Sequence, residues 1–384
     1  MTYSKILVTG ATGFIGSRLC EKLALQYRLP YRALVHNFSK AVRIARLGAE
    51  MAPGDLNNPA HLEAAVSGCD AVVHLAFGSA AKAEENLLAA CRSAKIKRFV
   101  HVSSMAVYGP SPSLECTHER TAKIGRYSEP YSDAKVRAEK TIQRAINNGL
   151  PGIILRPTVV YGPYSPFVIS IVRDARAGNV TLLDDGRGVC NAVYVDDVCD
   201  AIYAALSDDR ALGQAVVING DHAINWRDFN LTFANMISPR PQIANFSTEE
   251  ARAFWQTKKP SFRSNLAAVK KLLRSSSFQD QLETVPAFRS AIRWSKKSLK
   301  GVLSADRISA LAGPAARRPN QTLPLVPNPG RIVREDFRLE FSNELAKSLL
   351  NWTPCIDFAR GAELTRTWLE YSGMLGPSTR GERL

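Results

Sequence analysis

Short apolar runs alternate with amphipathic stretches along the first 150 residues of the chain. Apolar runs typical of buried strands lie near residues 5–9, 31–35, 49–52, 71–75 and 98–103. Apolar side chains recur at helical spacing near residues 14–26, 60–66, 82–94 and 132–148. This alternation predicts an α/β fold, a parallel sheet with helices on both faces. A further apolar run, Gly152 to Arg156, predicts another strand of the same sheet.

A glycine-rich turn joins the first predicted strand to the first predicted helix. The turn contains Gly10, Thr12, Gly13, Phe14, Ile15 and Gly16. Glycine suits this place because a Cβ would keep a pyrophosphate away from the backbone, and the helix N-terminus offers N–H groups and a positive dipole end. A glycine triplet alone also fits an ordinary tight turn. The apolar strand before it and the helical stripe after it favour a dinucleotide-binding, Rossmann-type site.

A tyrosine and a lysine lie four residues apart at the start of a later helix. Tyr131 and Lys135 therefore share one helix face. Upstream, an apolar strand ends in the two hydroxyls of Ser103 and Ser104. A lysine ammonium favours the phenolate of a nearby tyrosine, so Tyr131 is a candidate acid/base. Ser104 is a candidate hydrogen-bond partner of the same reacting oxygen.

These motifs, with others downstream, resemble the extended short-chain dehydrogenases/reductases of the NAD(P)-dependent epimerase/dehydratase type. The matching segments are VTGATGFIGS (8–17), GDL (54–56), HLAFG (74–78), HVSSMAVYG (101–109), YSDAK (131–135), LRPTVVYGP (155–163) and NAVYVDDV (191–198). They occur in the family's order and cover roughly residues 4–235. A segment near the end, 341–354, resembles the family's closing helix and turn.

The resemblance implies roles for individual residues. Tyr131 would transfer the proton, Lys135 would also bind the nicotinamide ribose, and Ser104 would orient the substrate oxygen. The cofactor would further contact Asp55 and Leu56 beside the adenine, Leu75 and Ala76 beneath it, and Ser103 and Pro157 near the nicotinamide. Two of these have other interpretations, because Asp55 suits a turn or helix cap and Ser103 a plain strand-end hydroxyl.

The end of the second predicted strand selects between the two nicotinamide cofactors. An acid there would bind the ribose 2′-hydroxyl and repel a 2′-phosphate. The chain has His36 and Asn37 at this place, with Lys40 and Arg43 close behind. Neutral donors and two cations favour NADP(H) over NAD(H). The alternative is that Lys40 and Arg43 are solvated helix residues.

Two departures from the family pattern bear on the reaction. Sugar 4,6-dehydratases of the family follow the catalytic hydroxyl with an Asp-Glu pair, whereas Met105 and Ala106 stand here. Neither side chain can act as an acid or base, so dehydration by that route is not expected. Many sugar-nucleotide enzymes carry Arg-Asp where this chain has Cys190 and Asn191, which weakens the case for a nucleotide diphosphate unless Arg187 or an arginine of the insertion compensates.

Three functions remain open from the sequence. The one that the motif layout favours is a sugar or nucleotide-sugar epimerase/oxidoreductase in glycan or polysaccharide biosynthesis. The second is an NADPH-dependent reductase or dehydrogenase of a non-sugar ketone or alcohol. The third is a non-catalytic cofactor-binding regulator, since a fold alone does not fix a function; the Ser104, Tyr131 and Lys135 set argues against it.

Length and composition predict a cytoplasmic protein of two parts. Residues 1–165 would form mainly the NAD(P)-binding domain, with sheet elements also from 190–220, and residues 166–384 mainly a smaller substrate-binding lobe. No apolar run is long enough to span a membrane, and the first strand starts too early for a signal peptide. Seven scattered cysteines without zinc spacing predict reduced thiols and no metal site.

Almost all of the net charge of +15 lies in one insertion-like segment. Residues 251–334 hold 17 Lys and Arg against 3 Asp and Glu. Within them, residues 287–303 could form a basic amphipathic helix, and 313–330 read as an extended connector. The charge suits a peripheral membrane contact or a diphosphate-bearing or lipid-linked substrate. No nucleic-acid motif accompanies it. A solvated lid is the alternative, and a homodimer is possible, although the short connection from His74 to Asn86 casts doubt on the family's usual dimer contacts.

Overall fold

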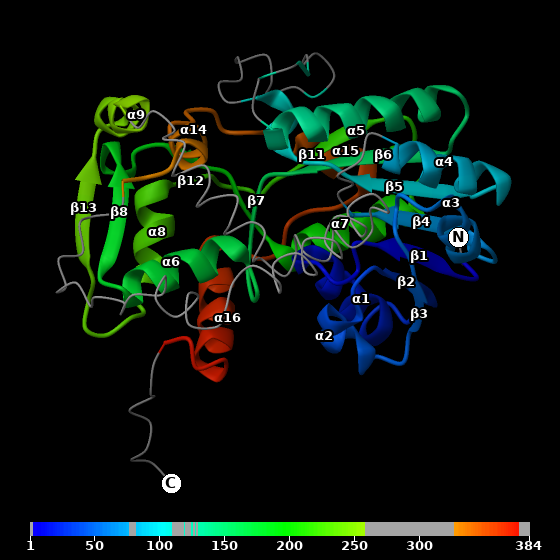
Figure 1. Ribbon diagram of the computed structural model, residues 1–384, viewed down its shortest axis with the longest axis horizontal. Coiled ribbons are helices and arrows are strands. Elements are labelled where there is room, and N and C mark those ends of the chain that lie inside the picture. The colour runs from blue at the N-terminus through cyan, green and yellow to red at the C-terminus, as the bar shows by residue number, and fades with distance from the viewer. Residues whose placement is uncertain are drawn as a thin grey trace, which may run out of the picture. The chain divides into compact units, whose positions relative to one another are not determined.

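The computed structural model describes residues 3–76, 82–109, 119, 124–125, 127, 130–257 and 326–375. Seven strands form the central sheet: β1 Ile6–Thr9, β2 Tyr31–Val35, β3 Glu50–Pro53, β4 Ala71–His74, β5 Arg98–Val102, β6 Gly152–Pro157 and β11 Ala215–Ile218. Their order is β11-β6-β5-β4-β1-β2-β3 (Figure 1), and every neighbouring pair is parallel. The predicted doubly wound α/β fold is confirmed.

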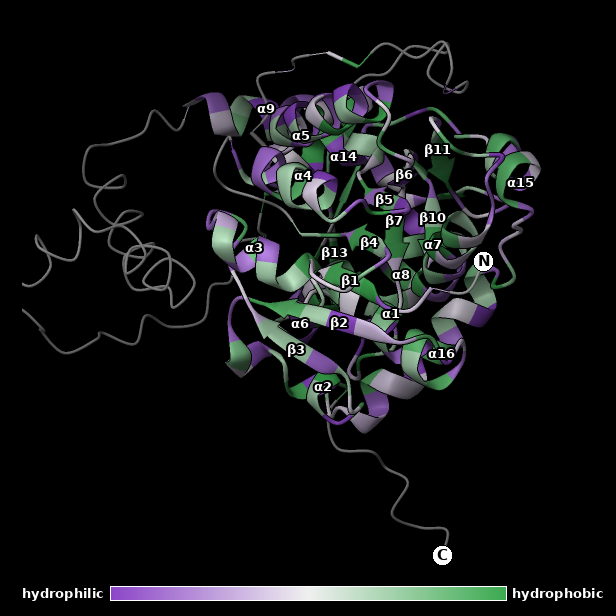
Figure 2. Ribbon diagram, turned by 90° about the vertical axis from the view of Figure 1, so that its right-hand side faces the viewer, coloured by the Kyte–Doolittle hydropathy of each residue, from purple (hydrophilic) through white to green (hydrophobic). Residues whose placement is uncertain are grey.

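Helices cover both faces of this sheet (Figure 1). The helices of the nucleotide-binding half are α1 Phe14–Leu25, α2 Val42–Ala45, α3 Pro59–Val66, α4 Ala83–Ser93, α5 Pro130–Asn147 and α7 Val195–Ser207. In β1, Ile6 and Val8 pack in the core shared with α1 and α7, while Leu7 packs in the core shared with α3, α4 and α5. Successive strand residues point to opposite faces, which is why a continuous apolar run marks a strand covered on both sides. Figure 2 shows these hydrophobic strands between the helices.

The remaining helices lie after β6 in the chain, and two of the three 3-10 turns lie between earlier strands. They are α6 Pro166–Arg176, α8 Trp226–Ala234, α9 Thr248–Thr257, α14 Pro329–Glu335, α15 Glu344–Leu350 and α16 Phe358–Tyr371, with 3-10 turns η1 Phe38–Lys40, η2 Met105–Tyr108 and η4 Asp184–Gly186. Three strand pairs stand apart from the large sheet: parallel β7 Val159–Tyr161 with β10 Ala192–Tyr194, parallel β8 Asn179–Leu183 with β13 Gln242–Phe246, and antiparallel β9 Val189–Cys190 with β12 Ile224–Asn225.

The two aspartates that follow β10 hold other parts of the chain in place. Both carboxylate oxygens of Asp197 accept backbone N–H groups, from Cys355 at 2.8 Å and Ile356 at 3.2 Å. Burial raises the pKa of Asp197 to about 6. Asp196 accepts two hydrogen bonds from Arg18, at 2.6 and 2.7 Å. Both aspartates therefore have structural contacts outside their own helix, Asp197 with the backbone at 355–356 and Asp196 with the Arg18 side chain.

The chain divides into two compact units, residues 1–248 with 329–384 and residues 249–328. The boundary predicted near residue 165 lies inside the first unit and stays a prediction. Residues 258–325 lie outside the described residues, and with them most of the basic segment and the helix predicted at 287–303. Part of the predicted connector, 329–330, is instead the start of α14. Among the helices that the structure describes, none is long and apolar enough to cross a membrane.

Candidate active site

The glycine turn between β1 and α1 packs its backbone against the loop that follows β4. Gly10 has a positive φ of 71°, and a Cβ there would lie 2.6 Å from the backbone nitrogen of Ala76. A Cβ on Gly16 would lie 2.1 Å from the carbonyl oxygen of Gly10. The N-cap residue of α1, Gly13, makes no side-chain capping bond. The two glycines thus allow close backbone packing around the turn, at a helix N-terminus suited to phosphate oxygens.

Thr9 ties the loop after β4 to the end of β1. Its Oγ1 accepts a hydrogen bond from the Ala76 N–H at 3.3 Å, and the Leu75 N–H donates to the Thr9 carbonyl at 3.2 Å. Leu75 and Ala76 are half-buried beside the glycine turn. The two loops predicted to lie under the cofactor are therefore neighbours at the carboxyl edge of the sheet, where open parallel sheets bind ligands.

The residues predicted to contact the adenine half of the cofactor lie at the ends of β2 and β3. Asp55 is half-buried, and its Oδ1 accepts from Asn57 N at 2.9 Å and Nδ2 at 3.0 Å. The helix that follows is capped by Asn58, not by Asp55. Asp55 therefore shapes a turn through one oxygen, as the alternative interpretation expected, and Leu56 is buried next to it.

The end of β2 presents polar side chains to solvent. His36 and Lys40 are exposed, and Asn37 accepts from the Ser39 backbone N–H at 2.9 Å to start η1. Arg43, by contrast, makes two bonds of 2.7 Å to Glu21 and lies over the Tyr164 ring at 4.1 Å. The Arg43 guanidinium is held inside the fold, so the case for a 2′-phosphate rests on His36, Asn37 and Lys40.

Ser104, Tyr131 and Lys135 come from two adjacent elements. Ser104 follows β5 and caps η2, with its Oγ accepting from the Ala106 N–H at 3.2 Å. Tyr131 lies in the first turn of α5 with 48% of its surface exposed, and Lys135 follows one turn later, buried. Helix α5 packs directly on η2. The exposed phenol, the hydroxyl at the strand end and the buried amine thus lie on neighbouring elements at one edge of the sheet.

Burial sets the charge balance of Lys135. It lowers the pKa of the ammonium to about 8, while Glu84 and Glu139 act in the opposite direction. The Nζ donates to the Val102 carbonyl at 3.3 Å. Lys135 lies one helical turn after Tyr131 on the same face of α5, and a cation near a phenol favours the phenolate.

The sequence analysis did not identify two functional candidates, Glu139 and Arg156. Ser103 Oγ donates to Glu139 at 2.6 Å, and Arg156 donates to the same carboxylate at 3.1 and 3.2 Å. All three side chains are buried. Ser103 is thus directed into the protein, as the strand-end interpretation expected. The spacing of Glu139, four residues after Lys135, was the signal that could have found it.

Cys190 and Asn191, which replace the family's Arg-Asp, are buried. The Asn191 amide donates to the Leu339 carbonyl at 2.8 Å, and its oxygen accepts from the Phe341 N–H at 2.9 Å. Pro157, at the end of β6, is buried as well. The hydroxyl of the next residue, Thr158, donates a hydrogen bond to the Asn219 side chain at 2.8 Å. Asn191 therefore anchors the segment after α14 and presents no cation to a ligand.

Arg334 in α14 belongs to the basic segment whose arginines were expected to compensate for the missing family arginine, and it contacts Glu335 at 3.4 Å. Its guanidinium lies 4.8 Å from the Phe167 ring centroid and 5.2 Å from that of Trp226. Its Nε has no hydrogen-bond partner among the described residues, and burial lowers its pKa. The other candidate, Arg187, is exposed and donates to the Asp184 carbonyl at 3.1 Å.

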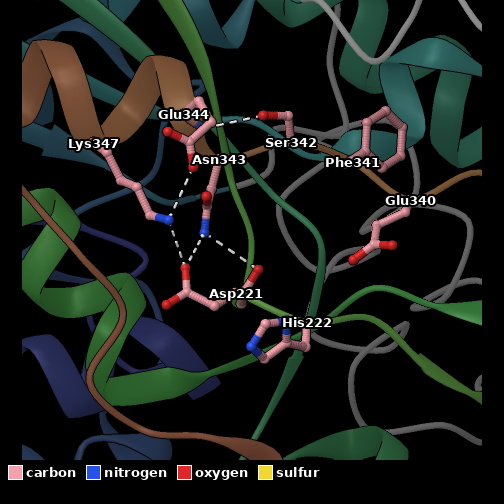
Figure 3. A pocket seen from close by; sticks show the side chains of 9 residues that line it. Asp221, His222, Glu340, Phe341, Ser342, Asn343, Glu344 and Lys347 are labelled. Carbon is pink, nitrogen blue, oxygen red and sulfur yellow. Dashed lines mark hydrogen bonds and ion pairs between the residues drawn. The ribbon is translucent and has the colours of Figure 1, made fainter.

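A polar groove of about 590 Å³ opens where β11 ends (Figure 3). Lys347 bridges Asp221 at 2.9 Å and Glu344 at 3.0 Å, and the Asn343 amide donates to Asp221 at 3.0 Å. The side chains that line it largely satisfy one another, and none of the residues predicted to bind cofactor or substrate lies in it.

Two buried histidines lie beneath the candidate site. The His74 and His101 rings stack with centroids 5.2 Å apart, and His74 Nδ1 bonds Thr9 Oγ1 at 2.7 Å. His74 Nε2 and both His101 nitrogens have no partner among the described residues. Burial, with a smaller contribution from the Lys135 charge, lowers the pKa of His74 to about 3. Burial also holds the pKa of His101 well below its ordinary value.

Comparison with known proteins places this architecture among enzymes of one family. The model of the NAD dependent epimerase/dehydratase family matches residues 6–219. A 4-hydroxy-2-methyl-3-oxo-4-farnesyl-3,4-dihydroquinoline-1-oxide ketoreductase of Stigmatella aurantiaca is 27% identical over 263 residues, covering 65% of this chain and 78% of the relative. A 2-alkyl-3-oxoalkanoate reductase of Stenotrophomonas maltophilia is 29% identical, covering 62% and 77%.

Solved structures of similar fold include a UDP-glucose 4-epimerase of Thermotoga maritima, with a TM-score of 0.66 and 18% identity over 96% of this chain and 99% of that one. A UDP-glucuronic acid 4-epimerase of Bacillus cereus, solved with NAD, has a TM-score of 0.63 and 18% identity over 96% and 99%. At this identity the likeness concerns the fold alone.

The buried histidines predict how stability depends on pH. The unfolded chain binds protons near pH 6.5 that the folded chain excludes, so the free energy of unfolding is highest above pH 6.5 and falls toward pH 3. Each histidine contributes at most about 1.4 kcal/mol per pH unit. Urea unfolding between pH 4 and pH 8 should show this slope. His101→Phe, which keeps a ring in the stack, should flatten it, and the exposed His222→Ala should not. Equal slopes in wild type and His101→Phe would contradict the assignment.

Proposed function

The chain belongs to the NAD-dependent epimerase/dehydratase family, and we propose that it interconverts a ketone and a secondary alcohol. The observation that carries this proposal is the adjacency of exposed Tyr131, buried Lys135 and the Ser104 turn. Tyr131 gives a proton to the substrate oxygen or takes one from it, Ser104 holds that oxygen, and Lys135 supplies positive charge beside the phenol. The chain is an enzyme of the extended short-chain dehydrogenase/reductase type, in agreement with the sequence analysis.

A nicotinamide cofactor fits the residues at the carboxyl edge of the sheet. The glycine turn from Gly10 to Gly16 and the start of α1, which has no side-chain cap, suit a pyrophosphate. The adenosine half would then run past Leu75, Ala76, Asp55 and Leu56. When bound, the nicotinamide would supply or accept a hydride. The proposed preference for NADP(H) is supported by the exposed His36 and Lys40 and by the lack of an acid at the end of β2.

The substrate proposed first is a non-sugar ketone, reduced to an alcohol. The two sequence relatives are named as reductases of keto compounds. Cys190, which stands at the place of the family's sugar-nucleotide arginine, is buried and offers no positive charge to a diphosphate, and Asn191 beside it is occupied with the backbone at 339–341. Met105 and Ala106 in η2 provide no acid or base for eliminating water, so epimerisation and simple redox chemistry remain.

A nucleotide sugar is the second candidate, and Arg334 favours it. A guanidinium that lies over two aromatic rings with an unpartnered Nε is suited to a phosphate oxygen. In this case the protein would act as an epimerase or oxidoreductase in glycan or polysaccharide biosynthesis.

Arg334→Gln tests this second candidate. The variant should raise KM for the nucleotide sugar, whereas it should leave KM for a simple ketone unchanged.

Tyr131→Phe tests the chemistry. The variant keeps the aromatic ring and loses the transferable proton, so turnover should fall by roughly 10²–10⁴, with cofactor binding retained. The rate is read from absorbance at 340 nm, and Tyr371→Phe, at a residue that is 89% exposed, is the matched control. Wild-type turnover by Tyr131→Phe would show that another group moves the proton.

Absorbance at 340 nm also distinguishes the two substrate classes. A ketone reductase should consume one equivalent of reduced cofactor per alcohol formed, and we expect this result with 2-alkyl-3-oxoalkanoates or related ketones. An epimerase should convert its sugar with no net change in the cofactor. Stereochemical conversion of a UDP-sugar at constant absorbance would establish the second candidate in place of the first.

His36→Asp tests the cofactor preference. A carboxylate at the end of β2 repels a 2′-phosphate and accepts from a ribose hydroxyl, so the variant should bind NADPH more weakly and NADH more tightly than the wild type. Equilibrium fluorescence titration with both cofactors measures the change. Asn37 stays in place, so η1 should be retained. A wild type that bound NADH at least about tenfold more tightly than NADPH, a difference of about 1.4 kcal/mol, would refute the preference.

A further inference from the structure

Four charged side chains are buried together around the first turns of α5. Lys135 and Glu139 come from α5, Glu84 from α4 and Arg156 from β6, and each has less than a tenth of its surface exposed. Two of these charges are positive and two negative. Buried charges are tolerated when they are paired and hydrogen-bonded, so the removal of one leaves the others out of balance.

Glu139 is the member that reaches three different elements. Its carboxylate accepts from Ser103 Oγ, at the end of β5, at 2.6 Å and from Arg156, in β6, at 3.1 and 3.2 Å. Arg156 in turn donates to the Tyr108 hydroxyl, in η2, at 2.7 Å. Ser104 lies between Ser103 and η2, so both sides of its turn are fastened through one carboxylate.

Building on the role proposed above for Tyr131, Lys135 and Ser104, we propose that Glu139 is their positioning residue. Through Ser103 and Arg156 it fixes the turn that carries Ser104. Its charge lies one helical turn from the Lys135 ammonium, on the same face of α5. Glu139 does not touch the reacting atoms itself.

The charges around Lys135 support a role of Glu139 in keeping the Lys135 ammonium protonated. Glu84 faces it from α4 and Glu139 from its own helix, and both favour the ammonium against the effect of burial. Among the described residues, Tyr131 lies one helical turn away on the same face of α5, and the Lys135 charge also acts on His74 in β4 and His101 in β5, which burial keeps neutral. The two carboxylates therefore supply the negative charge that retains the Lys135 proton near neutral pH.

Three variants distinguish the two parts of the proposed role, which are fixing the turn that carries Ser104 and supplying negative charge near Lys135. Ser103→Ala removes one hydrogen bond and no charge, Glu84→Gln removes a charge and no contact with Ser103, and Glu139→Gln removes both. Amide hydrogen exchange of residues 103–108 reads the turn, and the titration of the Lys135 ¹³Cε resonance, assigned with Lys135→Arg, reads the ammonium. Neither measurement requires a substrate.

We expect exchange at 103–108 to rise about fivefold or more in Ser103→Ala and Glu139→Gln, and to stay unchanged in Glu84→Gln. The Lys135 titration should move down by about one pH unit in Glu84→Gln and Glu139→Gln, and stay in place in Ser103→Ala. Glu139→Asp should keep the titration near that of the wild type. Because Glu139→Gln leaves Arg156 without its carboxylate, Glu139→Gln/Arg156→Met, which removes both charges, provides the exchange readout if the single variant does not fold.

An unchanged titration in Glu139→Gln, or unchanged exchange at 103–108 in the Glu139 variants, would overturn the proposal. A shift in both readouts, in a protein that reduces none of the ketones and converts none of the sugars, would uphold the positioning role and refute the proposed function instead. With an active substrate, the basic limb of the pH–rate profile should move to lower pH in both Glu→Gln variants, and the rate at low pH should fall only in Glu139→Gln.

Discussion

The parallel pairing of the seven strands is the constraint on which the candidate site depends. Parallel strands all end at one edge of the sheet, and β1, β4, β5 and β6 are neighbours in this one. Their ends bring together the glycine turn, the Leu75–Ala76 loop, the Ser103–Ser104 pair and Pro157, which are distant in the sequence. The close backbone approach at Gly10 and Gly16 then shapes that edge into a cradle for phosphate.

Around this edge the fold buries polar groups, and each set has a different consequence. Asn191, Asn219 and Asn343 bond one another and the backbone at 339 and 341, so they fasten the segment after α14 and carry no charge. The four charges at α5 are balanced, and they hold a lysine and a serine in place. The stacked His74 and His101 are neutral, and their ring nitrogens outnumber the partners available. The histidine pair makes the folded state sensitive to acid, whereas the asparagines and the four charges at α5 hold neighbouring segments together.

Several side chains at this edge are engaged with other groups or replaced relative to the family pattern. Arg43 is paired with Glu21, so the support for a 2′-phosphate comes from His36, Asn37 and Lys40. Met105 and Ala106 offer neither acid nor base. Arg334 is also paired, with Glu335 at 3.4 Å, but its Nε has no hydrogen-bond partner among the described residues and its guanidinium lies beside two aromatic rings.

The sequence by itself determined the sheet, its helices and the identity of the glycine, tyrosine, lysine and serine positions, because these follow from local periodicity and short spacing. The strand and helix bounds agree with the apolar pattern to within one or two residues, as at Tyr31–Val35 and Phe14–Leu25. Only the tertiary structure decided which polar groups meet. The union of Ser103, Glu139 and Arg156, the capture of Arg43 by Glu21 and the anchoring role of Asn191 join residues from separate elements, and no local pattern records such contacts. Whether a buried charged side chain is paired depends on the packing of the whole chain. For this reason the sequence around such a residue did not predict its role.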